Sequence, residues 1–75
     1  MDWRSVLGEN VRRLRRGLAL TQEQLAFEAQ IDLTYLGGIE RGRRNPSLLV
    51  MARIAAVLKV SPSALLELPP IAKGG

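Results

Sequence analysis

Apolar side chains in the first eighteen residues recur at a spacing that predicts an amphipathic helix. The steps between them are four, four, three and four residues, which places them on one helical face. They are Trp3, Leu7, Val11, Leu14 and Leu18. Arginines fill most of the remaining positions of the second half, at Arg12, Arg13, Arg15 and Arg16. We interpret Arg12, Arg13 and Arg16 as a solvated helix face, with contact of some of them to phosphate as the alternative.

Residues 21–41 have the pattern of two short helices joined by a tight bend. Thr21 and Gln24 form a T-x-x-Q capping box, and Asp32 offers a second N-cap before Leu33. Apolar stripes follow both caps, at Leu25, Ala26 and Ala29, and then at Leu36 and Ile39. Gly42 can adopt the left-handed conformation that ends a helix. Two helices of this length with a short join predict a helix-turn-helix.

The rest of the chain predicts two further helices. Ser47 is an N-cap for a stripe made of Leu48, Met51, Ile54, Ala55 and Leu58. The opposite face is also apolar, at Leu49, Val50, Ala56 and Val57, which indicates a surface for a partner. Ser61 and Pro62 begin a fifth short helix that carries Ala64, Leu65 and Leu66. We therefore expect an all-α, compact bundle of about five short helices in one domain, residues 1–67, and a flexible tail, residues 68–75.

Composition and charge favour a polyanionic partner and argue against catalysis. The chain of 75 residues has a net charge of +4, and its Lys and Arg residues, eleven in all, lie before Val60 with one exception. It contains no His and no Cys, which removes the commonest metal ligands, the thiol nucleophile and the usual general base. We expect no enzyme activity, metal, cofactor or small-molecule ligand.

No apolar stretch is long enough to span a membrane. The N-terminus carries Asp2, Arg4 and Glu9 where a signal peptide needs an apolar core. We therefore expect a cytoplasmic protein without membrane contact.

Three stretches carry a resemblance to a known family. They are TQEQLA at residues 21–26, TYLGGIERGRRNPS at residues 34–47 and LKVSPSALL at residues 58–66. The chain resembles the Cro and phage-repressor type of helix-turn-helix regulators, the XRE family, and within it the controller proteins of restriction-modification systems. The resemblance implies a lambda-repressor-like fold and binding of double-stranded DNA. A recognition helix at about residues 33–41 would enter the major groove.

The resemblance also implies roles for individual residues. Leu33, Thr34 and Gly38 occupy the positions that face the bases, although Leu33 lacks the polar side chain that the family often has there. Gln22 would contact a phosphate, and Arg15 would pair with Glu40.

The basic loop after the recognition helix is predicted from composition and position. Arg41, Arg43, Arg44 and Asn45 are well placed to contact phosphates that flank the groove. For Tyr35, packing against the bend and a phosphate contact through its hydroxyl are equal alternatives. Gly37 and Gly38 are costly within a helix, and either a close approach to a backbone or tight packing on a neighbouring helix would explain them.

Two positions depart from the family pattern. Ala19 stands where glycine is usual, while Gly17 replaces a helix former, so we expect the first helix to end early. Gln30 stands at the bend, where the family commonly has glycine and where a left-handed residue with a side chain costs roughly 1–2 kcal/mol.

Two functions from different classes follow from these features. The leading hypothesis is a sequence-specific transcriptional regulator that binds an inverted-repeat operator as a homodimer. Its predicted dimer interface consists of Leu49, Val50, Val57, Leu65 and Leu66. The alternative is a small helical module that binds another protein through this surface, with an incidental basic charge. A steep dependence of DNA affinity on salt would favour the regulator.

Overall fold

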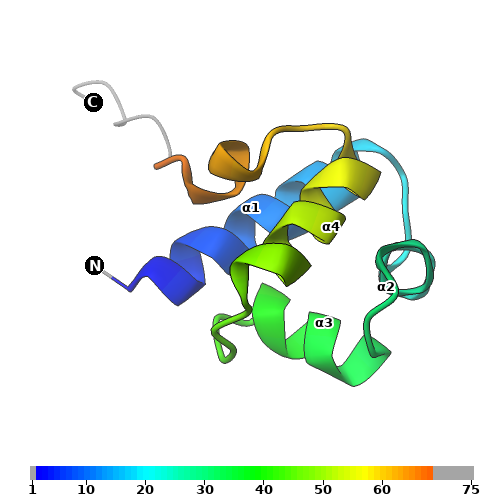
Figure 1. Ribbon diagram of the computed structural model, residues 1–75, viewed down its shortest axis with the longest axis horizontal. Helices are drawn as coiled ribbons and strands as arrows, with labels where there is room; N and C mark the ends of the chain where they lie inside the picture. The colour runs from blue at the N-terminus through cyan, green and yellow to red at the C-terminus, as the bar shows by residue number, and fades with distance from the viewer. Residues whose placement is uncertain (1, 69–75) are drawn as a thin grey trace.

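The computed structural model describes residues 2–68, which form four α-helices and one short 3-10 helix (Figure 1). The α-helices are α1 (Trp3–Gly17), α2 (Gln22–Ala29), α3 (Leu33–Glu40) and α4 (Leu48–Leu58). The 3-10 helix η1 (Pro62–Leu66) stands where a fifth helix was expected. The predicted all-α class is confirmed, with four α-helices in the described range instead of about five. The tail from residue 69 onward lies outside the described residues.

Short-range hydrogen bonds explain where the central helices begin. Thr21 Oγ1 accepts a bond of 3.0 Å from the Gln24 N–H, and Gln24 Oε1 accepts one of 2.8 Å from the Thr21 N–H, which completes the predicted capping box. The side chains of Asp32 and Ser47 each accept from the backbone N–H three residues further on. The starts of α2, α3 and α4 are therefore where the sequence pattern predicts them.

Helix ends at three places use a left-handed residue other than glycine. Ala19 follows α1 with a φ of 58°, Gln30 follows α2 with 60° and Lys59 follows α4 with 63°. The expected early end of the first helix is not observed, because Ala19 itself makes the left-handed turn where the family has glycine. The bend of the helix-turn-helix likewise forms at Gln30 despite its side chain.

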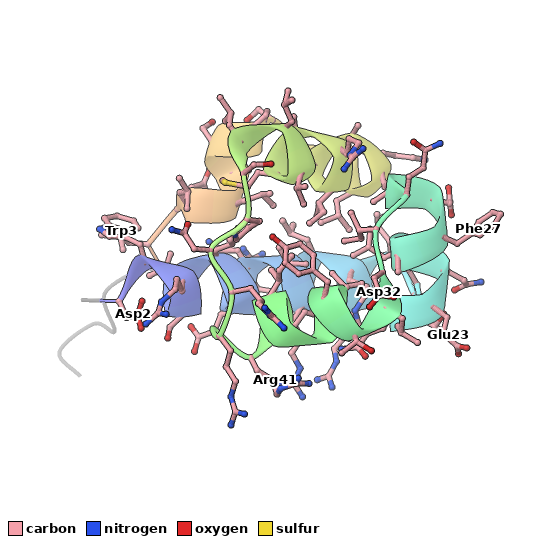
Figure 2. The ribbon with its side chains drawn as sticks, turned by 60° about the horizontal axis from the view of Figure 1, so that its bottom comes forward. Asp2, Trp3, Glu23, Phe27, Asp32 and Arg41 are labelled. Atoms are coloured by element: carbon pink, nitrogen blue, oxygen red, sulfur yellow. The ribbon has the colours of Figure 1, made fainter. Side chains whose placement is uncertain are left out.

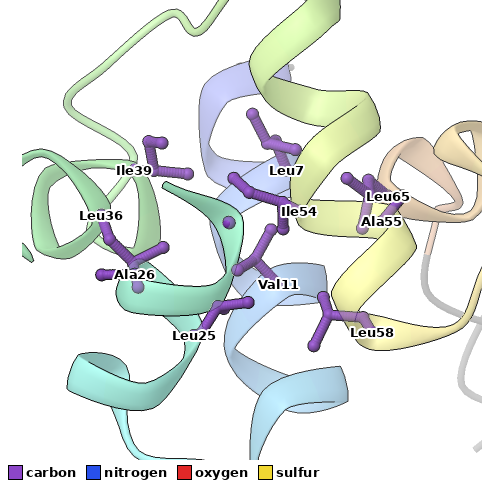
Figure 3. Packing of buried hydrophobic residues seen from close by; sticks show 11 residues of the cluster. Leu7, Val11, Leu25, Ala26, Leu36, Ile39, Ile54, Ala55, Leu58 and Leu65 are labelled. Atoms are coloured by element: carbon purple, nitrogen blue, oxygen red, sulfur yellow. The ribbon is translucent and has the colours of Figure 1, made fainter. Parts of the chain in front are cut away.

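One apolar core joins all five elements (Figure 3). Its members include Leu7, Val11, Leu25, Leu36, Ile39, Ile54, Ala55, Leu58 and Leu65. Three residues of the predicted stripes lie outside it: Trp3, Leu18 and Leu48 are exposed, while Val6 and Asn10 of α1 are buried instead. Trp3, Leu18 and Leu48 lie at or just beyond helix termini, where no neighbouring element covers the stripe.

Two residues of α1 make contacts that the sequence pattern did not indicate. Gly8 lies so close to the end of α3 that a Cβ atom there would meet the backbone oxygens of Ile39 and Glu40. Asn10 is buried, and its Nδ2 donates to the carbonyl oxygens of Leu65 at 2.9 Å and Glu67 at 2.8 Å. These contacts fix α1 against α3 on one side and against η1 on the other.

Candidate nucleic-acid interface

The N-terminal turn of α3 presents the side chains that the sequence predicted to face bases. Leu33 and Thr34 are exposed directly after the N-cap Asp32. Gly38 differs, because it is buried and therefore offers little surface to a base. The structure thus brings Leu33 and Thr34 together at the accessible start of α3 and sets Gly38 one turn further on.

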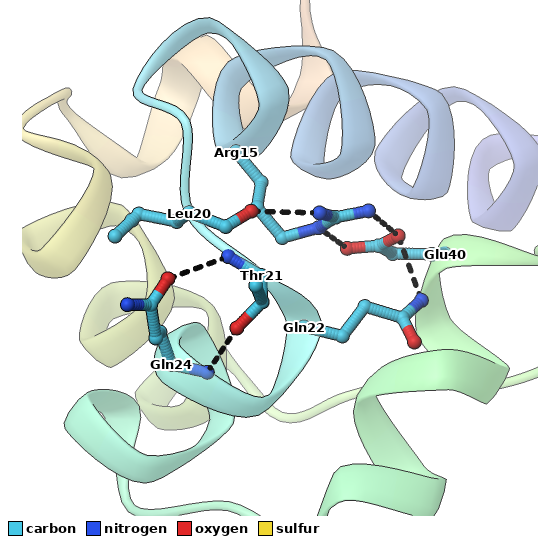
Figure 4. A network of polar contacts seen from close by, with 6 residues as sticks. All are labelled: Arg15, Leu20, Thr21, Gln22, Gln24 and Glu40. Atoms are coloured by element: carbon cyan, nitrogen blue, oxygen red, sulfur yellow. Dashed lines mark hydrogen bonds and ion pairs between the residues drawn. The ribbon is translucent and has the colours of Figure 1, made fainter.

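The carboxylate of Glu40 ties α3 to α1 and α2 (Figure 4). It accepts hydrogen bonds from Arg15 Nε at 2.7 Å, from Arg15 Nη2 at 3.0 Å and from Gln22 Nε2 at 3.0 Å. Arg15 Nη1 also donates to the Leu20 carbonyl at 2.8 Å. The hydrogen bonds that Arg15 donates to Glu40 raise the pKa of the Arg15 guanidinium. Both side chains are buried, and each of their buried nitrogen and oxygen atoms has a hydrogen-bond partner within the described residues.

A polar groove lies beside this ion pair. Its lining comes from α1, the N-terminus of α2 and one edge of α3: Arg12, Arg15, Arg16, Thr21, Gln22, Glu23, Leu33, Glu40 and Arg41. Gln22, the predicted phosphate ligand, donates one amide hydrogen to Glu40, and its second amide hydrogen is available to another acceptor. The sequence pattern does not associate Arg12 and Arg16 with this groove, because the lining residues come from three separate helices.

The basic residues after α3 are exposed, and two of them fold back along this helix. Arg41, labelled in Figure 2, places its guanidinium beside Gly37. The Arg44 guanidinium carbon lies 5.7 Å from the centroid of the half-buried Tyr35 ring. Arg43 and Asn45 are exposed in the same loop.

These arginines account for the paired glycines of α3. A Cβ at Gly37 would lie 3.1 Å from Arg41 Nη1, and a Cβ at Gly38 would lie 2.8 Å from Arg44 Cγ. The nearest atoms at both positions thus belong to arginine side chains, and not to a backbone or a neighbouring helix, which were the two alternatives drawn from the sequence.

The residues predicted for a dimer interface separate into three groups. Leu49 and Leu66 are exposed, by 76% and 39%. Val50 and Val57 are partly buried against the core. Leu65 has an exposed fraction of 0% and belongs to the core of this chain, so the prediction that it contacts a partner is corrected. Leu48, exposed by 72%, adjoins Leu49 and extends the accessible apolar surface.

Among residues 2–68, no group of three or more His, Cys, Asp or Glu side chains could hold a metal ion. No helix in the same range is both long enough and apolar enough to cross a membrane.

A helix-turn-helix with an accessible second helix and flanking arginines defines the class of DNA-binding transcriptional regulators. Residues 11–65 match the model of the helix-turn-helix family HTH_3, and the chain belongs to this family, the XRE type. It is a regulator and not an enzyme.

Relatives and solved structures agree with this assignment. The chain is 41% identical over 69 residues to the control protein C.BamHI of Bacillus amyloliquefaciens, covering 91% of this chain and 85% of that protein. The restriction-modification controller protein C.AhdI of Aeromonas hydrophila superposes with a TM-score of 0.80 at 40% identity, over 83% of this chain and 94% of that one. SinR, a master regulator of biofilm formation whose structure is in complex with DNA, superposes with a TM-score of 0.78 at 32% identity, over 81% and 98%.

Proposed function

We propose that this protein is a sequence-specific, cytoplasmic transcriptional regulator that binds double-stranded DNA as a homodimer and inserts α3 into the major groove. The observation that carries this proposal is the exposed N-terminal turn of α3, with Leu33 and Thr34 accessible and arginines on either side. Thr34 can hydrogen-bond a base edge or contact a thymine methyl, whereas Leu33 makes apolar contact only. Gly38 contributes by giving Arg44 room along the helix.

Phosphate contacts come from the polar residues around α3. Arg41, Arg43 and Asn45 are exposed in or beside the loop after the helix, and Gln22 has one amide hydrogen available at the start of α2. Arg44 and the hydroxyl of Tyr35 would act together, since the guanidinium lies over the ring. Such contacts position the helix and supply most of the salt-dependent affinity.

A homodimer would double the number of base pairs that the protein contacts. One recognition helix contacts only a few base pairs, whereas specific regulators reach dissociation constants of roughly 10⁻⁸ to 10⁻¹¹ M. A two-fold dimer with recognition helices about 34–36 Å apart would bind an inverted repeat with centres about 10 base pairs apart. We assign the interface to the surface of Leu48, Leu49 and Leu66, with Val50 and Val57 at its margin, because a two-fold contact uses the same patch on both subunits.

Selection of binding sites from random duplexes, with the parent protein and the Thr34→Ala variant, tests this function. We expect the parent to select an inverted repeat and the variant to lose preference at one base pair per half-site, equivalent to roughly 1–3 kcal/mol. Identical selected sequences would remove Thr34 from the readout. A parent with no selected sequence and no salt dependence of binding would overturn the regulator in favour of a protein-binding module.

A further inference from the structure

Two arginines of α1 lie in the groove beside the recognition helix, although the sequence favours a solvated face for them and offers phosphate contact only as the alternative. Arg12 and Arg16 line this groove together with Gln22 at the start of α2 and Arg41 at the end of α3. Both are exposed, and neither guanidinium forms a hydrogen bond or ion pair within residues 2–68. Arg13, which lies between them in sequence, differs because its Nη2 donates to Asn10 Oδ1 at 3.0 Å and it does not line the groove.

The groove has an excess of positive charge. Arg15 and Glu40 neutralise each other in their ion pair. The remaining charged residues of the lining are three arginines, Arg12, Arg16 and Arg41, against one glutamate, Glu23, which leaves a net charge of +2. An open groove with this charge and with amide and guanidinium donors suits an anion whose oxygens accept several hydrogen bonds, and phosphate is such an anion.

The groove lies on one edge of the accessible face of α3, and Arg44 lies on the other. Leu33 and Glu40 line the groove, and they are seven residues apart, so their side chains leave the helix in nearly the same direction. Tyr35, which carries Arg44 over its ring, is about 200° further round the helix from Leu33 at about 100° per residue. Thr34 lies between these two edges. A helix in the major groove has one phosphate strand on each side.

We infer that Arg12 and Arg16 of α1, with Gln22 and Arg41, form a phosphodiester subsite that binds one DNA strand, opposite the strand contacted by Arg44. This inference rests on the proposed insertion of α3 into the major groove. Arg12 and Arg16 are therefore DNA-binding residues, and α1 takes part in the interface along with the helix-turn-helix.

Salt dependence of binding tests the subsite with a matched control on the same helix. Affinity for a fixed duplex is measured between 50 and 200 mM salt for the parent, Arg12→Ala, Arg16→Ala and Arg13→Ala, after circular dichroism has verified the fold of each. We expect Arg12→Ala and Arg16→Ala each to reduce the slope of log affinity against log salt by about 0.9, and Arg13→Ala to leave it nearly unchanged. If the parent slope is steep but Arg12→Ala and Arg16→Ala have the same slope as Arg13→Ala, the subsite is overturned while the proposed function stands. A parent affinity independent of salt would overturn the proposed function as well.

A second measurement assigns the strands. Neutral methylphosphonates are introduced one at a time along each strand of the selected duplex, and affinities are compared for the parent, Arg12→Ala/Arg16→Ala and Arg44→Ala. We expect the affinity of the double variant to be insensitive to methylphosphonates on one strand of each half-site. The affinity of Arg44→Ala should be insensitive to methylphosphonates on the other strand. Loss of sensitivity on the same strand in both would contradict the inferred arrangement.

Discussion

The side chain of Arg44 lies across Gly38, so that a Cβ atom at this position would come within 2.8 Å of Arg44 Cγ. The glycine therefore gives the arginine stem a path along the recognition helix, and the guanidinium reaches the Tyr35 ring. Arg44 lies in the loop after the helix, so the conformation of this loop depends on the residue at position 38. A substitution at this position can therefore affect stability and DNA binding in different directions.

Gly38→Ala should stabilise the fold while weakening DNA binding. Alanine is favoured over glycine within a helix by about 0.5–1 kcal/mol, and the three nearest atoms all belong to the exposed Arg44 side chain, which can change its rotamer. Its movement removes Arg44 from Tyr35. Thermal unfolding and DNA affinity, measured on the same preparation, would show a higher Tm with a lower affinity. An unchanged affinity would mean that the position of Arg44 over Tyr35 is irrelevant to binding.

Gly8→Ala should have the opposite effect on stability. A Cβ at this position would meet the backbone oxygens of Ile39 and Glu40, the latter at 2.8 Å, and backbone atoms cannot move aside as a side chain can. We expect a loss of roughly 1–3 kcal/mol in the free energy of unfolding, as for other overpacked sites. Gly17→Ala is a suitable control, because its Cβ would meet nothing within 4 Å. Equal urea midpoints for the two variants would contradict the close contact of α1 with α3.

Removal of one partner from the Arg15 and Glu40 ion pair should cost more than removal of both. Glu40→Ala leaves the buried guanidinium without a carboxylate and Gln22 without its acceptor, which we expect to destabilise the protein by roughly 3–5 kcal/mol. The double variant Arg15→Met/Glu40→Leu should recover part of this loss, because no buried charge remains. Chemical denaturation of the parent, Glu40→Ala and the double variant gives the three free energies of unfolding. A double variant less stable than Glu40→Ala would refute this reasoning.

Glycine at the three left-handed positions should raise stability. Ala19→Gly, Gln30→Gly and Lys59→Gly each remove a side chain from a conformation that disfavours one, with an expected gain of about 1 kcal/mol each. Arg53→Gly, at an exposed position inside α4, is the contrasting control and should lose about 0.8 kcal/mol. Calorimetric Tm values that fall for all four variants would indicate that the left-handed sites carry no strain.

Introducing a carboxylate into the proposed dimer surface should give a folded monomer. Leu49→Glu and Leu66→Glu each place like charges against one another across a two-fold axis, whereas neither disturbs the core, because both side chains are exposed. Sedimentation at micromolar concentration should show a dimeric parent and monomeric variants with poor operator binding. Phe27→Glu, on exposed surface of α2 outside this patch, serves as the control. A parent that stays monomeric with and without operator excludes the dimer.

The sequence predicts the starts of the central helices because the interactions involved are local. The N-caps at Thr21, Asp32 and Ser47 bond to backbone N–H groups three residues away, which a pattern can reveal. Core stripes inside the helices are predicted for the same reason. The resemblance adds the pairing of Arg15 with Glu40, which are 25 residues apart and which no local pattern would connect.

Other features were missed because they depend on distant contacts. The role of Asn10 comes from carbonyl groups 55 and 57 residues away, and that of Gly8 from the end of α3. Leu65 and Leu66 look equivalent in the sequence, yet the docking of η1 on α1 and α4 buries only the first. The sequence favours a solvated face for Arg12 and Arg16, because their groove exists only once α1, α2 and α3 are assembled.

The hydrogen bonds of Glu40 have a mechanical consequence for DNA recognition. They join α1, α2 and α3 through one buried carboxylate. In addition, Gly8 of α1 packs closely against the backbone at the end of α3, which leaves no space between the two helices there. The angle of the recognition helix to its two neighbours therefore cannot adjust to a duplex of the wrong shape without breaking buried interactions. In the proposed complex, any mismatch in curvature or groove width would therefore have to be absorbed by the DNA. We therefore expect the stiffness of base steps that the protein never touches to contribute to its choice of operator.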